Sequence, residues 1–154
     1  MGGYVALNLA LQQPKMIQSI VTLGTKFDWS PEAVDKELRM LNPDKIEDKV
    51  PKFAEKLKQN HSPADWKEVM HKTVKIMKGM GEGKRMELKQ MSQIKLNVVI
   101  GLGTEDKMVT ETESIEVANE LSNGKFIKLE GMLHPIDSAN PKDIENYIKE
   151  SLKA

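Results

Sequence analysis

Apolar residues follow two different spacings along this chain, and the change of spacing divides it into elements. Residues 1–12 are uncharged and carry apolar side chains at helical spacing, which predicts a helix buried on most sides. Three short segments are instead continuously apolar and rich in β-branched residues, which is typical of buried strands: 16–24, 96–103 and 125–131. Lys125 and Lys128 indicate that the third strand has an exposed face or lies at a sheet edge.

Helix start signals follow the second and third strands. Thr110 and Glu113 have the spacing of a capping box in front of an apolar helical run, and Asn123-Gly124 closes that run. Asn140-Pro141 predicts the start of a last helix, whose apolar residues share one face: Ile144, Tyr147, Ile148 and Leu152. Strands alternating with helices through short loops predict a parallel sheet with right-handed crossovers. The fold class is therefore α/β, with three parallel strands and flanking helices.

The segment between the first two strands has a different character. Residues 26–95 are rich in lysine and glutamate, contain no convincing strand pattern and predict three or four short helices. Three polar residues followed by proline have the pattern of a helix cap and a first helical position: Ser30-Pro31, Asn42-Pro43 and Ser62-Pro63. We interpret 26–95 as a helical cap or lid inserted into a core formed by 1–25 and 96–154.

Composition excludes several classes of function. The 154 residues carry 23 basic and 23 acidic side chains, so no basic excess indicates a nucleic acid or an anionic membrane as partner. Because cysteine is absent, disulfides, thiolate metal sites and cysteine nucleophiles are excluded. No apolar stretch approaches the length of a membrane span, and we expect a cytoplasmic protein that needs no cofactor.

Asp106 is the first candidate catalytic residue. It lies in GLGTEDKMV, just after the second predicted strand. Functional crevices of open α/β sheets lie outside the carboxyl ends of the strands, which favours a functional role. Taken alone, however, a carboxylate here is more often a loop residue close to the N-terminus of the next helix, where negative charge is stabilised.

His134 shifts the interpretation of Asp106 toward a functional role. It lies in LEGMLHPIDSANP after the third predicted strand, so one helical crossover separates it from Asp106. Neighbouring parallel strands place their following loops side by side, and a carboxylate next to a histidine fixes the imidazole tautomer and stabilises the protonated ring. The pair therefore favours acid–base chemistry over an inert surface histidine. His61 and His71 lie within the insertion at a spacing that does not favour a metal site.

The opening residues Met1-Gly2-Gly3-Tyr4, followed by an Ala- and Leu-rich helix, resemble the residues after the nucleophile serine in the α/β-hydrolase family. There the serine stands in a G-x-S-x-G elbow, in which Gly2 would be the last glycine and Met1 the residue after the serine. The resemblance continues in the same order along the chain: the strand 18–25, an insertion at the position of the lid, the acid loop GLGTED and the histidine loop HPIDSANPKDIENYI.

The resemblance implies an ester, thioester or similar acyl hydrolase of the Ser–Asp–His type. It assigns the acid of the triad to Asp106, the histidine to His134 and one oxyanion-hole N–H to the backbone of Met1. No G-x-S-x-G occurs in the 154 residues, so the nucleophile would stand one residue before Met1. We therefore expect the C-terminal half of such a hydrolase, inactive as it stands. The alternatives are a non-catalytic, self-associating binding or assembly module and a truncated product without a function of its own.

The resemblance also leads to an expectation about partners. In the intact family fold, a strand ending at the nucleophile pairs with the strand at 16–24, and without it that strand exposes an unpaired edge. We expect a homodimer formed through this edge, and a small-molecule ester-like substrate only where the N-terminal half is present. Ten methionines, many in or near the insertion, either line an adaptable acyl pocket or pack the helices, and the sequence leaves both interpretations open.

Overall fold

The chain divides into two compact units in a computed structural model that describes residues 1–153. Of the described residues, the first unit comprises 1–27 and 86–153, and the second comprises 28–85. The sequence pattern assigns residues 86–95 to the insertion, but they belong to the first unit. The reason is that Met91 and Ile94, each 2% exposed, are buried in the core of that unit.

A sheet of three parallel strands forms the centre of the first unit, which confirms the predicted fold class. The strands are β1 (Ser19–Leu23), β2 (Asn97–Gly103) and β3 (Gly124–Leu129), in the spatial order β1-β2-β3. β2 is central and is buried at every residue after Asn97, as expected for a strand covered on both faces. β1 and β3 are the two edges of the sheet.

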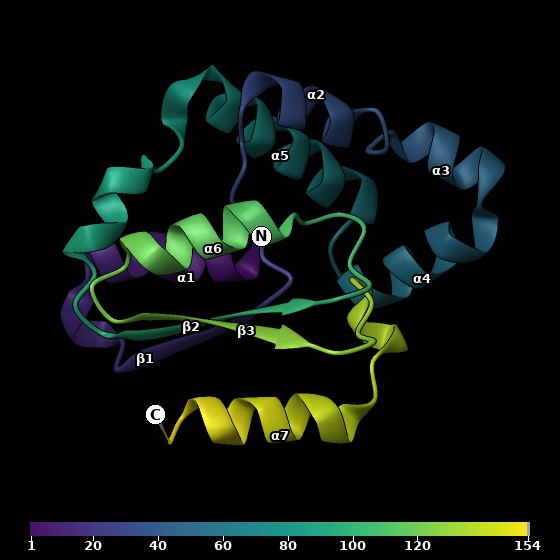
Figure 1. Cartoon of the computed structure of the whole chain (residues 1–154). Helices are drawn as coiled ribbons and strands as arrows, with labels where there is room; N and C mark the ends of the chain where they lie inside the picture. The colour runs from purple at the N-terminus through teal and green to yellow at the C-terminus, as the bar shows by residue number, and fades with distance from the viewer. Residues whose placement is uncertain (154) are drawn as a thin grey trace. The chain divides into compact units, whose positions relative to one another are not determined.

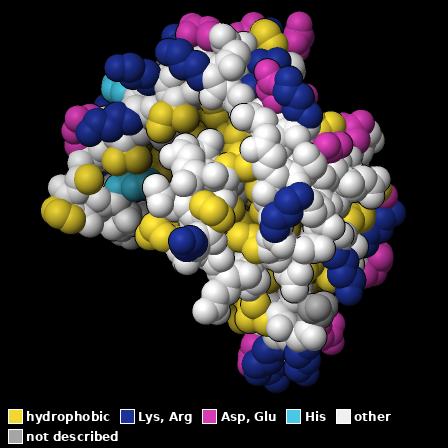
Figure 2. Space-filling view, turned by 90° about the vertical axis from the view of Figure 1, so that its left-hand side faces the viewer, with side chains coloured by type: hydrophobic (Ala, Val, Ile, Leu, Met, Phe, Trp, Pro, Cys, Tyr) yellow, Lys and Arg dark blue, Asp and Glu magenta, His cyan; other side chains and the backbone are white. Residues whose placement is uncertain are grey.

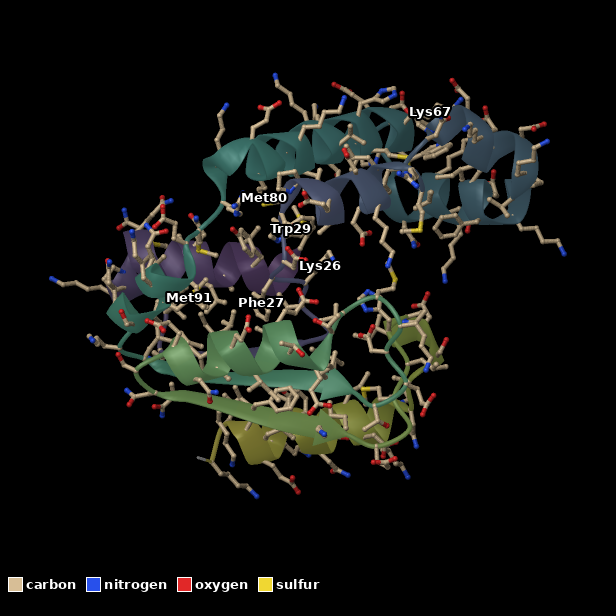
Figure 3. The ribbon with its side chains drawn as sticks, turned by 45° about the horizontal axis from the view of Figure 1, so that its top comes forward. Lys26, Phe27, Trp29, Lys67, Met80 and Met91 are labelled. Carbon is tan, nitrogen blue, oxygen red and sulfur yellow. The ribbon has the colours of Figure 1, made fainter. Side chains whose placement is uncertain are left out.

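Helices cover both faces of this sheet (Figure 1). α1 (Gly2–Gln12) and α6 (Glu111–Glu120) lie on one face, and α7 (Pro141–Ser151) lies on the other. Short 3₁₀ turns occur at Pro14–Met16, Leu88–Gln93 and Ile136–Ser138. The largest core cluster joins α1, α6 and the sheet, and its buried members include Leu7, Ile20, Met91, Val98, Ile100 and Val117. The side chain of Phe27 packs against this cluster, on the same side of the sheet as Met91 (Figure 3).

The predicted caps of α6 and α7 are confirmed. Thr110 and Glu113 form a reciprocal capping box at the start of α6, and Asn140 accepts a hydrogen bond from the N–H of Lys142 at the start of α7. Glu113 does more than cap, because its Oε2 also accepts the N–H of Phe27 at 2.8 Å. This bond ties the chain leaving β1 to helix α6.

A second backbone tie occurs at the other boundary of the insertion. The N–H of Met86 donates to the Oη of Tyr4 at 2.6 Å, and Tyr4 is a buried residue of α1. The segments entering and leaving residues 28–85 are therefore each hydrogen-bonded to a helix of the first unit.

The second unit is helical, with a separate small core. Its helices are α2 (Pro31–Leu38), α3 (Pro43–Lys49), α4 (Pro51–His61) and α5 (Trp66–Gly79), followed by a π-helical turn at Met80–Lys84. The core cluster of this unit contains Ile46, Ala54, Trp66 and Met70. On the surface, the Nζ of Lys67 contacts the carboxylates of Glu47 and Asp44, which raise the pKa of Lys67 (Figure 3).

Two of the three predicted caps in this unit are confirmed and one is wrong. The side chains of Ser30 and Asn42 cap α2 and α3 as predicted. Ser62-Pro63 begins no helix and lies instead in the turn between α4 and α5. Helix α5 starts at Trp66, because the carboxylate of Asp65 accepts the N–H of Lys67 and caps it there.

Hydrophobic side chains of this chain occur both in its cores and on its surface. Figure 2 shows hydrophobic side chains exposed among intermixed basic and acidic side chains. Among residues 1–153, no helix combines the length and the apolar character that crossing a membrane requires. Met70 and Met91 pack in the cores of their respective units, so for these two residues the packing interpretation is the correct one.

Tyr147 attaches α7 to the sheet. It is 4% exposed, and its Oη donates a 2.7 Å hydrogen bond to the carbonyl oxygen of Thr22 in β1. Gly101 of β2 makes room for this contact, since a Cβ at that position would lie 2.5 Å from the same Oη. Burial raises the pKa of Tyr147 to about 12.

We expect Tyr147→Phe to lower the free energy of unfolding by about 1 kcal/mol at neutral pH, because it removes the bond to Thr22. The wild-type chain should lose further stability as the pH rises from 10.0 through about 12, since unfolding releases a proton that the buried phenol retains. The Phe variant lacks this component. Urea unfolding of both chains across this range measures the difference, and parallel stability curves would contradict the assignment.

Candidate active site

Asp106 and His134 meet at the carboxyl end of the sheet. Asp106 follows β2 and His134 follows β3, and the Nδ1 of His134 lies 2.8 Å from the Oδ2 of Asp106. The Asp106 side chain is 2% exposed, whereas that of His134 is 30% exposed. The two residues singled out in the sequence thus form one buried-acid, accessible-histidine pair.

The orientation of the Asp106 carboxylate is fixed by the turn in which it lies. Its Oδ1 accepts the backbone N–H groups of Met108 at 2.8 Å and Val109 at 3.0 Å. Its Oδ2 faces His134, so both oxygens are engaged. Because two backbone donors hold one oxygen, the other is presented to the imidazole in a single direction.

Backbone contacts hold the acid loop against the histidine loop. The N–H of Thr104 donates to Leu129 at 3.0 Å, and that of Glu105 donates to Met132 at 3.1 Å. Gly103 allows this close approach, since a Cβ there would lie 2.0 Å from the carbonyl oxygen of Met132. The distance between Asp106 and His134 therefore rests on main-chain structure.

Gly24 is a third contributor to the site. From the sequence it is predicted only as the last residue of the strand 16–24. It follows β1 in the left-handed region with a φ of 56°. A Cβ at this position would lie 3.1 Å from the Oδ2 of Asp106 and 3.4 Å from the Nδ1 of His134. All three strands therefore end at the pair. The sequence signal that could have identified Gly24 was a glycine at the end of the strand that pairs with the strand before the acid loop.

The start of α1 lies at this same end of the sheet. A Cβ at Gly3 would lie 2.2 Å from the Oγ1 of Thr25, the residue after Gly24, and 2.9 Å from the Cγ2 of Thr22. Met1 directly precedes α1. The glycine is required because helix and strand approach so closely.

The arrangement is suited to proton transfer at the Nε2 of His134. Within residues 1–153 the hydrogen-bonding partner of the His134 side chain is Asp106, and no serine or threonine hydroxyl of that range is bonded to it. A carboxylate on Nδ1 holds the proton there and leaves Nε2 as the basic nitrogen. His61 and His71 lie in the second unit, and no group of three or more acidic, histidine or cysteine residues in the described range is arranged to hold a metal ion.

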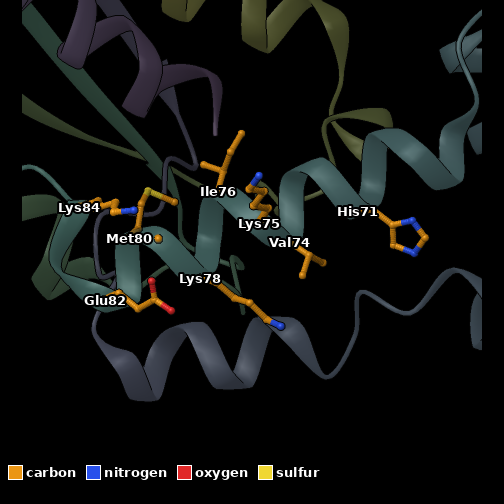
Figure 4. Close-up of a pocket in the computed structure, with 9 residues that line it drawn as sticks. His71, Val74, Lys75, Ile76, Lys78, Met80, Glu82 and Lys84 are labelled. Carbon is orange, nitrogen blue, oxygen red and sulfur yellow. The ribbon is translucent and has the colours of Figure 1, made fainter.

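A surface groove in the second unit is separate from this chemistry. It has a volume of about 710 Å³ and follows α5 and the π-helical turn (Figure 4). Its lining combines apolar and basic side chains, among them Val74, Lys75, Ile76, Lys78 and Met80. Neither Asp106 nor His134 lines it, so we place the candidate active site at the acid–histidine pair.

Comparison with known proteins supports the fold. No protein-family model and no curated protein matches the chain. Among solved structures, NosK from Streptomyces actuosus has a TM-score of 0.76 at 15% identity, over 99% of this chain and 65% of that one. MGS-M2, an α/β-hydrolase enzyme from a Medee basin deep-sea metagenome library, has a TM-score of 0.68 at 17% identity, over 99% and 62%.

A third structure, the 2-hydroxy-6-oxo-6-phenylhexa-2,4-dienoate hydrolase BphD from Rhodococcus sp. strain RHA1, has a TM-score of 0.68 at 16% identity. It is matched over 100% of this chain and 62% of its own. The fold is that of the α/β-hydrolases, as the resemblance in sequence implies. The chain spans less than two thirds of the length of each of these three structures.

The hydrogen bond to Asp106 leads to a prediction that does not depend on activity. We expect neutral His134 to carry its proton on Nδ1, and Asp106→Ala to shift it toward the mixture of tautomers of a free imidazole. Long-range ¹H–¹⁵N correlation spectra measure the tautomer of each histidine. His61 and His71 are internal controls that should not change, and an unprotonated Nδ1 of His134 in the wild-type chain would contradict the geometry.

Proposed function

We propose that this chain supplies the acid and the histidine of a serine-type acyl hydrolase, with Asp106 as the acid and His134 as the general base. The observation that carries the proposal is the 2.8 Å contact between Nδ1 and Oδ2, made by a carboxylate that is itself held by two backbone donors. The α/β-hydrolase fold supports it, because in that fold the acid of the triad precedes the histidine along the chain, as Asp106 precedes His134 here.

In this reaction, the Nε2 of His134 removes the proton of a serine hydroxyl as its oxygen attacks the acyl carbon of an ester or thioester. The resulting imidazolium is stabilised by the carboxylate of Asp106 and then donates its proton to the leaving group. In the second half of the reaction, water deprotonated by the same Nε2 attacks the acyl carbon, the bond to the serine oxygen breaks, and the imidazolium returns its proton to that oxygen as the acid is released. In this assignment the backbone N–H of Met1 is one donor to the oxyanion.

The nucleophile is proposed to be a serine immediately before Met1. Two observations support this position. Gly2 and Gly3 match the residues after the serine in the family motif, and Gly3 lies against Thr22 and Thr25 at the end of the sheet that carries the pair. The 154 residues contain no G-x-S-x-G of their own. We therefore propose that they do not perform triad hydrolysis without a preceding segment.

Residues 28–85 are proposed to act as the lid. They form a compact helical unit that connects β1 to the rest of the core, which is where the family carries its lid. Both connections are hydrogen-bonded to the first unit, by Phe27 and by Met86. A lid of this kind determines which acyl and alcohol groups reach the histidine.

The test compares hydrolysis of a p-nitrophenyl ester by two chains. One is the 154-residue chain, and the other carries at its N-terminus the preceding part of an α/β-hydrolase, ending in Gly-x-Ser directly before Met1. We expect activity in the extended chain alone. His134→Ala in that chain should lower kcat on the order of 10³-fold or more, as loss of a triad member does.

His71→Ala in the extended chain is the matched control and should leave kcat unchanged, because His71 lies in the second unit. Circular dichroism and labelling of the serine with a fluorophosphonate establish that the extended chain is folded and its nucleophile present. A folded, labelled chain whose activity does not depend on His134 overturns the proposal. Activity of the 154-residue chain that disappears in His134→Ala overturns the upstream position of the nucleophile.

A further inference from the structure

One buried carboxylate joins two chain segments that lie next to the acid–histidine pair. Glu113 is 7% exposed, and its two oxygens accept different backbone donors. Oε1 accepts the N–H of Thr110 at 2.7 Å, and Oε2 accepts the N–H of Phe27 at 2.8 Å. The first contact completes the capping box of α6, whereas the second reaches a residue 86 positions away along the chain.

The capping box alone does not require a carboxylate at position 113. Glutamine serves there as well as glutamate, because a single oxygen reaches back to the N-cap N–H. The other end of an amide is a donor and cannot accept a second N–H. Since burying a carboxylate is costly unless its oxygens are hydrogen-bonded, the second contact, with Phe27, explains why residue 113 is Glu113.

The contact with Thr110 lies next to the turn that orients Asp106. The N–H groups of Met108 and Val109 hold the Oδ1 of Asp106. The next N–H along the chain is that of Thr110, which Glu113 accepts. Three successive N–H groups are thus bonded to two carboxylates, so the position of Glu113 bears on the direction in which Asp106 faces.

The contact with Phe27 holds the segment that leaves β1. This segment begins at Gly24, where a Cβ would lie 3.1 Å from the Oδ2 of Asp106 and 3.4 Å from the Nδ1 of His134. The main chain at Gly24 therefore lies directly against the acid–histidine contact. Three residues later, the N–H of Phe27 is bonded to Glu113.

We propose that Glu113 is a positioning residue of the hydrolase site. It holds the turn of Asp106 and the segment leaving β1 in one arrangement, and through these backbone contacts it keeps Asp106 and His134 together. The role in catalysis rests on the proposed function of the pair, whereas the geometry of the pair can be measured without a reaction.

Glu113→Gln separates the two contacts. Its amide oxygen can keep the contact with Thr110, but its NH₂ group then faces the N–H of Phe27 and cannot accept it. In the 154-residue chain, we expect the amide of Phe27 to exchange about fivefold faster or more. Neutral His134 should also lose part of its Nδ1–H tautomer, toward the mixture found in Asp106→Ala. Hydrogen exchange and long-range ¹H–¹⁵N spectra measure these two quantities.

Thr110→Val is the matched control for helix capping. It removes the hydroxyl that accepts the N–H of Glu113 at 3.3 Å, but it leaves the backbone donors of both carboxylate contacts in place. It should lower the free energy of unfolding, as loss of a cap does, and leave the exchange of Phe27 and the tautomer of His134 unchanged. An equal tautomer shift in Thr110→Val and Glu113→Gln would overturn the proposal, because helix stability would then account for both.

Glu113→Ala removes both contacts and provides a second variant, which does not depend on the orientation of the glutamine amide. If Glu113→Gln and Glu113→Ala, whichever of them circular dichroism shows to be folded, keep the wild-type tautomer of His134, the proposal is wrong.

Activity provides a separate readout in the extended chain that ends in Gly-x-Ser before Met1. There we expect Glu113→Gln to lower kcat about tenfold with little change in KM, since a displaced base affects the chemical step more than binding. Hydrolysis that does not depend on His134 would contradict the proposed function, but the exchange and tautomer measurements would still decide whether Glu113 positions the pair. An unchanged kcat beside a shifted tautomer would overturn the role of Glu113 in catalysis.

Discussion

The parallel pairing of β2 with both of its neighbours is the constraint on which the rest of this structure depends. It brings the carboxyl ends of three strands to one side, so Gly24, Asp106 and His134 converge although they are far apart in the sequence. Covering a sheet with two apolar faces also requires α1 and α6 on one face and α7 on the other. The site and the layers are thus two consequences of the same pairing.

Much of this arrangement can be predicted from the sequence, because the relevant signals are local. The strands are short apolar runs, and the caps at Ser30, Asn42, Thr110 and Asn140 are side chains that bond to backbone two or three residues away. Asp106 and His134 could be chosen because each lies in the loop that follows a strand. Their proximity then required only the rule that adjacent parallel strands align their ends.

The features that escaped prediction depend on contacts between distant segments. Gly24 became part of the site only through its distance to Asp106 and His134, which no local pattern encodes. Residues 86–95 read as insertion because they are polar, yet Met91 and Ile94 anchor them in the first core. Ser62 and Asp65 are both residues of the type that caps a helix. Helix α5 begins after Asp65, because Asp65 lies directly before Trp66, which is buried in the second core.

The two backbone ties at the boundaries of the insertion have a mechanical consequence. The N–H of Phe27 is bonded to Glu113, which caps the helix that begins just after the turn of Asp106, and the N–H of Met86 is bonded to Tyr4 in α1. Both connections are therefore held, on the first-unit side of the boundary, by helices of the core that carries the site. The contacts described above that fix the spacing of Asp106 and His134 come from residues of the first unit, so this spacing rests on no residue of the second.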